Sequence, residues 1–143
     1  MPRSHQSDPA ESELLAPVLR LFPKCRFVRL AEAAVGQKRI DLLCCARNDD
    51  SASGRVAVEL KVRDWRRATW QAHVNLQVAQ HSYVAIWHAY AHLPRHAALR
   101  RAGVGLIVVG PRGARIVLES EDRVFRVARE LKRDFYAATT MCL

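Results

Sequence analysis

The apolar positions of this chain change their spacing from helical to strand-like and back, and this pattern predicts a mixed fold. Near the start, an apolar stripe at helical spacing predicts a first helix, with the members Leu14, Leu15, Val18, Leu21 and Phe22. Two later segments, residues 39–46 and 55–62, are short, rich in apolar residues and bounded by turn formers, which is typical of strands. Residues 47–54 between them are turn-forming types, so the two strands are expected to pair as a β-hairpin.

The first helix has a start signal of its own. Asp8 is expected to be its cap, Pro9 its first residue and Glu11 the acid of a capping box. Pro17 lies within the apolar stripe and has no backbone N–H, so it is expected to kink the helix by removing the bond to Glu13.

The same rules predict the other elements. They are a strand at 25–31 with Gly36 at the turn after it, a helix at 65–80 capped by Asp64, a strand at 82–87, a short helix between Pro94 and Gly103, strands at 104–109 and 115–118, and a closing helix from residue 121. The order αβββαβαββα predicts an α/β (α+β) fold, in which an antiparallel meander is followed by a right-handed crossover that adds parallel strands. Because the chain has 143 residues, half of them hydrophobic, we expect a single domain over residues 1–143.

Three charged residues of the hairpin are expected to meet on one patch. If the hairpin folds about residues 50 and 51, paired positions add up to about 101, and Asp41 then faces Leu60. Side chains alternate along a strand, so Glu59 and Lys61 share one face while their apolar neighbours point into the core. Two carboxylates and an ammonium group at one spot suit the binding of a divalent cation and the stabilisation of an anionic transition state. The competing interpretation is an exposed strand face with ordinary charges.

An acid-x-lysine triplet alone carries little information, because the chain contains a second one. Glu130 and Lys132 have the same spacing, but the apolar residues around them recur at helical spacing. Residues two apart on a helix point to different sides, so this pair cannot converge on one ion. The strand context, with an acid on the hairpin partner, distinguishes Glu59 and Lys61.

The charge of the chain favours a polyanionic partner. The formal net charge is +9 and the sequence pI is about 10.1, and basic side chains bind phosphates with release of counterions. Arg63, Arg66 and Arg67 cluster directly after Lys61, at the start of the expected second helix, and are therefore candidate nucleic-acid-binding residues. A solvated basic turn is the alternative interpretation of this cluster.

Four stretches agree in order with a known family. They are residues 36–41 (GQKRID), 56–61 (VAVELK), 68–72 (ATWQA) and 83–86 (YVAI). Over residues 9–109 the chain thereby resembles the PD-(D/E)xK nuclease superfamily, whose members share a restriction-endonuclease-like αβββαβ core with a mixed central sheet flanked by helices. Ile40 stands where the name of the motif has proline, at a position that varies within the superfamily.

The resemblance implies a Mg²⁺-dependent (endo)deoxyribonuclease in which Mn²⁺ would substitute for Mg²⁺. Asp41 and Glu59 would hold the ion together with the backbone carbonyl of Leu60, because Mg²⁺ prefers oxygen ligands. The ion would lower the pKa of a bound water and neutralise charge on the scissile phosphate. Lys61 would orient that water or stabilise the developing negative charge.

Two further residues are implied by the resemblance. Gln71, on the expected second helix, would position water or a nucleotide, and as an alternative it is an exposed helix residue. Glu13 matches an acid that some members carry on the first helix, where it would complete the metal shell. DNA is the expected partner and RNA stays open. A homodimer is compatible with one site cutting one strand, although no interface can be read from the sequence.

Other function classes have weaker support. A nuclease fold that only binds nucleic acid would not need two carboxylates beside phosphate. A zinc site at His88, His92 and His96 would require a continuous helix, which Pro94 interrupts. The three tryptophans could stack on unpaired bases or pack at element boundaries. The sequence has no signal-peptide pattern or apolar span, so a cytoplasmic location with reduced cysteines is expected.

Overall fold

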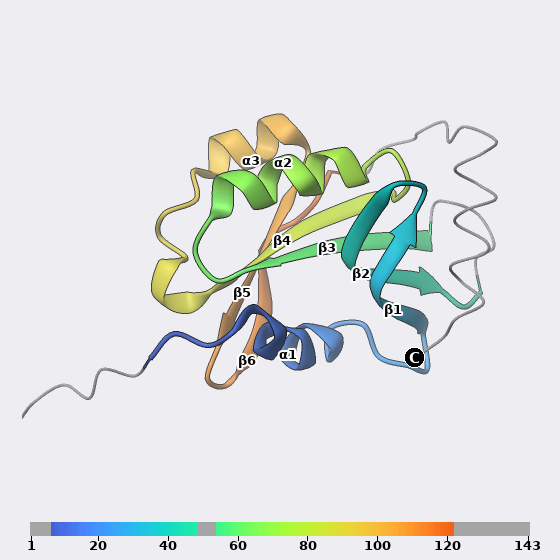
Figure 1. Cartoon of the computed structure of the whole chain (residues 1–143), viewed down its shortest axis with the longest axis horizontal. Coiled ribbons are helices and arrows are strands. Elements are labelled where there is room, and N and C mark those ends of the chain that lie inside the picture. Colours follow the sequence, from blue (N-terminus) through green and yellow to red (C-terminus); the bar gives the residue numbers. More distant parts are fainter. Residues whose placement is uncertain (1–6, 49–53, 122–143) are drawn as a thin grey trace, which may run out of the picture.

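The computed structural model describes residues 7–48 and 54–121 of the chain. In this part of the chain, six strands form one mixed sheet with helices on both faces (Figure 1). The strands are β1 (Phe27–Val35), β2 (Lys38–Ala46), β3 (Arg55–Lys61), β4 (His81–Trp87), β5 (Gly105–Gly110) and β6 (Gly113–Leu118). The helices are η1 (Glu11–Leu14), α1 (Leu15–Leu19), α2 (Trp65–Asn75), η3 (His88–Tyr90) and α3 (His96–Ala102). The expected mixed α/β architecture is confirmed.

The strands lie in the sheet in their order along the chain. β1, β2 and β3 are antiparallel, β3, β4 and β5 are parallel, and β6 returns antiparallel to β5. The expected meander followed by parallel strands is therefore confirmed. Because α2 connects the parallel pair β3 and β4, it lies across the sheet face directly over these two strands (Figure 1).

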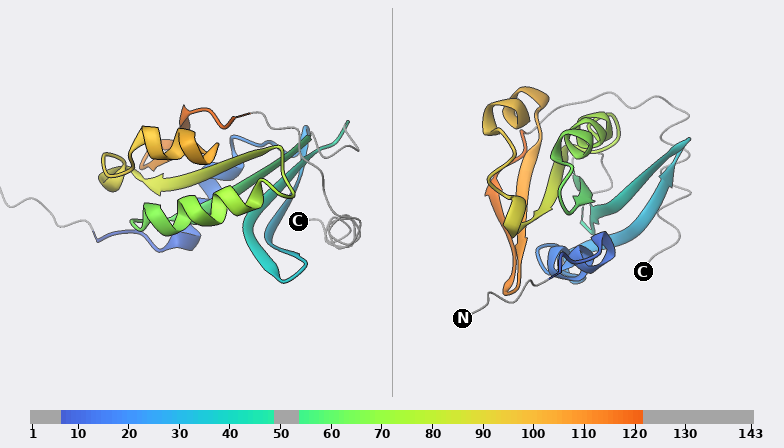
Figure 2. Two further views of the ribbon diagram at one scale, coloured as in Figure 1. Left: turned by 90° about the horizontal axis from the view of Figure 1, so that it is seen from above. Right: turned by 60° about the vertical axis from the view of Figure 1, so that its left-hand side comes forward.

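Both faces of the sheet are covered, so its central strands are buried on both sides. Helix α1 covers one face, and α2 and α3 cover the other (Figure 2). The α1 face is closed by a buried cluster that includes Leu14, Val18, Phe22, Val58, Leu60, Tyr83 and Ile107. The α2 and α3 face is closed by a cluster that includes Ala68, Ala72, Val84, Ile86, Leu99 and Leu106. Glu59 alternates with Val58 and Leu60 along β3, so it points to the face that α2 covers.

The start of the first helix differs from its prediction. The cap is Ala10 rather than Asp8, and the acid that closes the turn is Glu13 rather than Glu11, because the Glu13 carboxylate accepts the backbone N–H of Ala10 at 2.6 Å. The first turn is a 3₁₀ helix and α1 begins only at Leu15. Pro17 consequently lies in the first turn of α1, where its missing N–H costs little.

Several element boundaries also differ from their predictions. β1 begins two residues later than expected and continues to Val35, and α2 ends at Asn75 instead of residue 80. Three apolar residues beyond its end are buried in the segment that follows the helix: Leu76, Val78 and Ala79. The one-turn helix η3 is not anticipated by any sequence signal discussed above. The predicted closing helix, including Glu130 and Lys132, lies outside the described residues.

Backbone conformations at three positions explain local features. Gly36 and Gly103 have φ of 61° and 75°, which confirms their predicted positions at a turn and beyond a helix end. Glu32 in β1 has a φ of 50°, which is strained for a residue with a side chain.

The buried cysteines and the lengths of the helices are two further features of the fold. Cys44 and Cys45 pack in different clusters on opposite faces of the sheet, and neither forms a disulfide with another described residue. Burial raises the pKa of the Cys44 thiol to about 12, so it stays protonated at neutral pH. Within the described part of the chain, no helix is long and apolar enough to cross a membrane.

Candidate active site

The candidate site lies where strands β2 and β3 separate. Their ladder runs from Cys45 opposite Arg55 to Leu42 opposite Val58, so partner numbers add up to 100 rather than 101. The connection between the last paired residues, Cys45 and Arg55, is centred on residue 50. The prediction centred it between residues 50 and 51, so the observed pairing differs from the predicted pairing by one residue. Asp41 is therefore level with Glu59 instead of Leu60.

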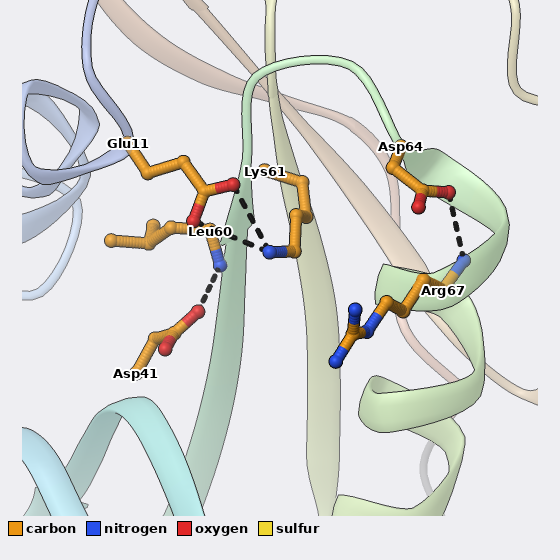
Figure 3. A network of polar contacts seen from close by, with 6 residues as sticks. All are labelled: Glu11, Asp41, Leu60, Lys61, Asp64 and Arg67. Carbon is orange, nitrogen blue, oxygen red and sulfur yellow. Dashed lines mark hydrogen bonds and ion pairs between the residues drawn. The ribbon is translucent and has the colours of Figure 1, made fainter.

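Although it is level with Glu59, Asp41 contacts Leu60 through its side chain. The Asp41 carboxylate accepts the backbone N–H of Leu60 at 2.9 Å, where the ladder between the two strands has ended (Figure 3). The N–H and C=O of one strand residue point to the same side of the strand, so the carbonyl of Leu60 also faces the opening beside Asp41. Two oxygen-bearing groups thus line the opening between β2 and β3.

Glu59 carries a buried carboxyl group. Only 2% of the residue is exposed, and the side-chain amide of Asn75 on α2 donates to its Oε1 at 2.7 Å. Burial raises the pKa of Glu59 to about 8. The hydrogen bond from Asn75 opposes this shift, whereas the charge of Asp41 and its hydrogen bond with Glu59 add to it. The interpretation of Glu59 as part of an exposed charged face is therefore wrong. A carboxyl group with a raised pKa next to a second acid is typical of functional sites.

Lys61 stands at the carboxyl end of β3. Its ammonium group donates to both carboxylate oxygens of Glu11, at 3.0 Å and 3.3 Å, and about a fifth of its side chain is exposed (Figure 3). Because half of the Glu11 side chain is exposed, this ion pair contributes only about 0–1 kcal/mol to stability. Lys61 is thus held beside Asp41 and Glu59 by a weak contact that a stronger anion could replace.

The two remaining candidates differ in their positions. Gln71 lies one helical turn before Asn75 on the same face of α2, and its Oε1 is buried with no hydrogen-bond partner among the described residues. Glu13 caps its own helix, as described above, and Glu11 is the acid of that helix that contacts Lys61. The structure therefore brings Gln71 to the α2 side of the site and Glu11, in place of Glu13, to the opposite side.

Backbone strain coincides with the site. In the register of β1 and β2, Ala31 pairs with Leu42 and Ala33 pairs with Ile40, so the interrupted position is Glu32 opposite Asp41. This is also the position where Glu32 adopts its positive φ. Strained backbone is concentrated at functional sites, and here it lies in β1 at the position opposite Asp41.

The basic residues divide into two groups. The backbone N–H of Arg67 donates to Asp64, which caps α2 as predicted, and the Arg67 side chain projects from α2 on the side of β3 (Figure 3). Arg63 and Arg66 line a separate hollow together with Arg95. The three basic candidates are thus placed around the first turn of α2 but do not share one surface.

The histidine alternative finds no support in side-chain placement. His88, His92 and His96 are exposed and lie on three different local structures. Over residues 7–48 and 54–121, no group of three or more His, Cys, Asp or Glu side chains is placed to hold a metal ion. A cation at the hairpin would accordingly use two carboxylates and a backbone carbonyl.

Sequence reasoning missed Asn75 and Glu11. Asn75 has a usable signal, because Ala68, Ala72 and Asn75 follow one buried helical stripe in which only Asn75 is polar. Glu11 has none, since its contact with Lys61 spans fifty positions of the chain and depends on tertiary packing.

Comparisons with known proteins give a fold relative but no function. No family model and no curated protein matches the chain. A solved structure of a protein of unknown function from Silicibacter pomeroyi is similar with a TM-score of 0.65 at 20% identity, covering 94% of this chain and 87% of that one. SfsA from Pyrococcus furiosus, solved in complex with Ca²⁺, aligns with a TM-score of 0.42 at 14% identity, covering 80% of this chain and 64% of that one. The first similarity extends to the fold alone, and the second is too low to support an argument.

Proposed function

We propose that this chain is a metal-dependent nuclease of the PD-(D/E)xK type that hydrolyses DNA phosphodiester bonds, with Mg²⁺ as its cofactor. The observation that carries the proposal is the buried Glu59 carboxyl group, which lies beside Asp41 at the point where β2 and β3 separate. Keeping an acid in a buried position next to a second acid destabilises the fold unless a ligand compensates for it. A divalent cation is the ligand that two adjacent carboxylates attract most strongly.

The donor set fits Mg²⁺. Asp41, Glu59 and the carbonyl of Leu60 would supply three oxygens, and a magnesium ion with few protein ligands keeps its other positions for water and phosphate oxygens. The raised pKa of Glu59 fits as well, because a bound cation displaces the proton and returns the carboxylate to its charged form. Asn75 would continue to donate to Glu59 and would hold that carboxylate in one orientation.

The chain's own residues have distinct roles in this proposal. Bound Mg²⁺ supplies an activated water and neutralises phosphate charge. Lys61 would leave Glu11 when a phosphate arrives, because the ion pair is weak, and its ammonium group would then stabilise charge that develops on phosphate oxygens. Gln71 presents a buried acceptor without a partner, so its amide is suited to hold a water or a nucleotide group.

Cleavage assays of single variants test the proposal. Asp41→Asn, Glu59→Gln and Lys61→Met should each reduce cleavage of DNA in Mg²⁺ or Mn²⁺ by at least about a hundredfold, and EDTA should abolish cleavage by the wild type. Supercoiled, linear, single-stranded and branched DNA should all be offered. Circular dichroism of each variant verifies that its fold is retained.

A matched control uses the second acid-x-lysine triplet of the chain. Glu130→Gln and Lys132→Met change the same residue types, and they should leave cleavage nearly unchanged. Absence of cleavage on every substrate, together with tight DNA binding, would instead favour a nucleic-acid-binding protein that lacks catalysis. Full activity in Glu59→Gln would remove the buried carboxyl group from the mechanism.

A further inference from the structure

Two adjacent hollows lie beside α2 and α3. The first, of about 490 Å³, is lined by Arg63, Asp64, Trp65, Arg66, Leu93 and Arg95. The second, of about 400 Å³, lies between α2 and α3 and is lined by Arg66, Thr69, Trp70, His73, Ala98, Arg101 and Ala102. Arg66 lines both, so the two hollows adjoin at this residue, and we call them together the α2–α3 groove.

The arginines of the α2–α3 groove are available to a ligand. Among the described residues, no ion pair or side-chain hydrogen bond engages Arg63, Arg66, Arg95 or Arg101. Two of them are oriented by aromatic rings, since the guanidinium of Arg63 lies 5.4 Å from the ring centre of Tyr90 and that of Arg66 lies 5.3 Å from the ring centre of Trp65. Asp64, the one acid among the described residues that line the groove, is used as the cap of α2. The groove therefore carries an excess of positive charge that suits phosphates.

Trp70 adds an aromatic surface to this charge. It is 66% exposed, the largest exposure of any large hydrophobic residue in the described part of the chain. The ring of His73 lies beside it, with ring centroids 6.2 Å apart and an interplanar angle of 36°. The Nδ1–H of His73 donates to the carbonyl of Ala102 on α3 at 2.8 Å, which holds the imidazole in place. Ala98 and Ala102 opposite are small, so they leave space beside the indole.

We propose that the α2–α3 groove binds an unpaired segment of nucleic acid, with a base stacked on Trp70 and flanking phosphates at the arginines. An exposed indole can stack on an unpaired base, whereas the bases of an intact duplex are stacked on one another and offer no free face. The inference rests on the proposed function for the identity of the ligand, and it deepens that function by assigning single-stranded or partly unwound DNA as the substrate class. Arg63 lines the groove and follows Lys61 by two positions, so this end of the groove lies near the candidate active site. A bound DNA strand would continue from the groove in that direction.

Binding measured without cleavage tests this proposal. The probe is a short fluorescein-labelled oligodeoxythymidine in EDTA, compared by anisotropy with a duplex of equal length. The wild type should prefer the single strand, Trp70→Ala should weaken single-strand binding about tenfold, and Trp70→Phe should restore most of it, since phenylalanine keeps a stacking face. Quenching of tryptophan emission on titration should be smaller in Trp70→Phe than in the wild type.

Consecutive arginines of α3 provide a matched control. Arg101 lines the groove whereas Arg100 lines a different hollow, so Arg101→Ala should reduce both the affinity and the salt dependence more than Arg100→Ala. The inference would be overturned if the wild type preferred the duplex, or if Arg101→Ala and Arg100→Ala had equal effects. Polyglutamate carries negative charge but no bases, so it provides a further test. If it displaced the oligodeoxythymidine equally well from the wild type and from Trp70→Ala, binding would depend on charge alone, which would also overturn the inference. A protein that binds the single strand through Trp70 but cleaves nothing would keep this inference and refute the proposed nuclease activity.

Discussion

The pKa of Glu59 makes a prediction about the stability of the metal-free protein. Its folded-state pKa of about 8 lies above its ordinary value of 4.5, so the folded state keeps a proton that the unfolded state releases. The resulting stabilisation is complete below pH 4.5 and is lost as the pH rises to 8. Between pH 5 and pH 8, we expect the free energy of unfolding in EDTA to fall by roughly 2–4 kcal/mol through this residue.

Glu59→Gln isolates this contribution. Glutamine is neutral at every pH and retains an oxygen that accepts from Asn75, so the variant should lose less stability than the wild type over the same interval. Urea denaturation at pH 5 and pH 8 measures the difference. If the free energy of unfolding changed equally with pH in the two proteins, Glu59 would titrate near its ordinary value. Its burial would then be no evidence for a functional site.

At the scale of single elements, β5 depends on a glycine that packs against β4. A Cβ at Gly105 would lie 2.5 Å from ring carbons of Tyr83 and 2.6 Å from the backbone oxygen of Leu118. Gly105→Ala should therefore destabilise the protein by about 1–3 kcal/mol, since a ring and a backbone must both shift.

The other end of the same strand supplies the control. At Gly110 the nearest atom to an added Cβ is 3.8 Å away, so Gly110→Ala should be neutral within about 1 kcal/mol. Thermal melts of the two variants provide the comparison. Equal destabilisation would show that the loss arises from the glycine backbone and not from crowding.

Most elements could be predicted from the sequence because their signals are local. Short apolar runs bounded by turn formers identified β2 and β3, Asp64 identified the start of α2, and Gly103 identified the end of α3. The end of α2 was harder, since apolar residues pack equally well in a helix and in a buried turn.

The candidate site was predictable only where its residues share the hairpin. Strand alternation placed Asp41 near Glu59 and Lys61, apart from one residue of register. The burial of Glu59 was not visible, because it requires α2 to fold back over β3. Glu11 and Asn75 reach the site from opposite faces of the sheet, and such contacts depend on packing that no local pattern encodes.

For the whole molecule, metal binding and folding should be linked. On the proposed function, Mg²⁺ or Mn²⁺ would bind only the folded site, so a concentration one hundredfold above Kd should stabilise the wild type by about 2.7 kcal/mol. Because the ion must displace the proton of Glu59, the gain should be larger at pH 8 than at pH 6.

Asp41→Asn should reduce this gain strongly, since it removes one of the two carboxylates while its amide oxygen still accepts from Leu60. Melting curves with EDTA and with millimolar metal at both pH values test the linkage. A metal response that is identical in the wild type and in Asp41→Asn would remove this residue from the site.

The strained backbone at Glu32 has a consequence beyond the site. β1 is an edge of the sheet, with hydrogen-bonding groups on one side that have no strand beside them in the described part of the chain. Such an edge can recruit a strand from another copy of the protein and seed aggregates. The positive φ of Glu32 breaks the regular row of these groups, and its charged side chain, 71% exposed, stands at the break. We therefore expect the distorted position opposite Asp41 to oppose uncontrolled self-association of the sheet as well.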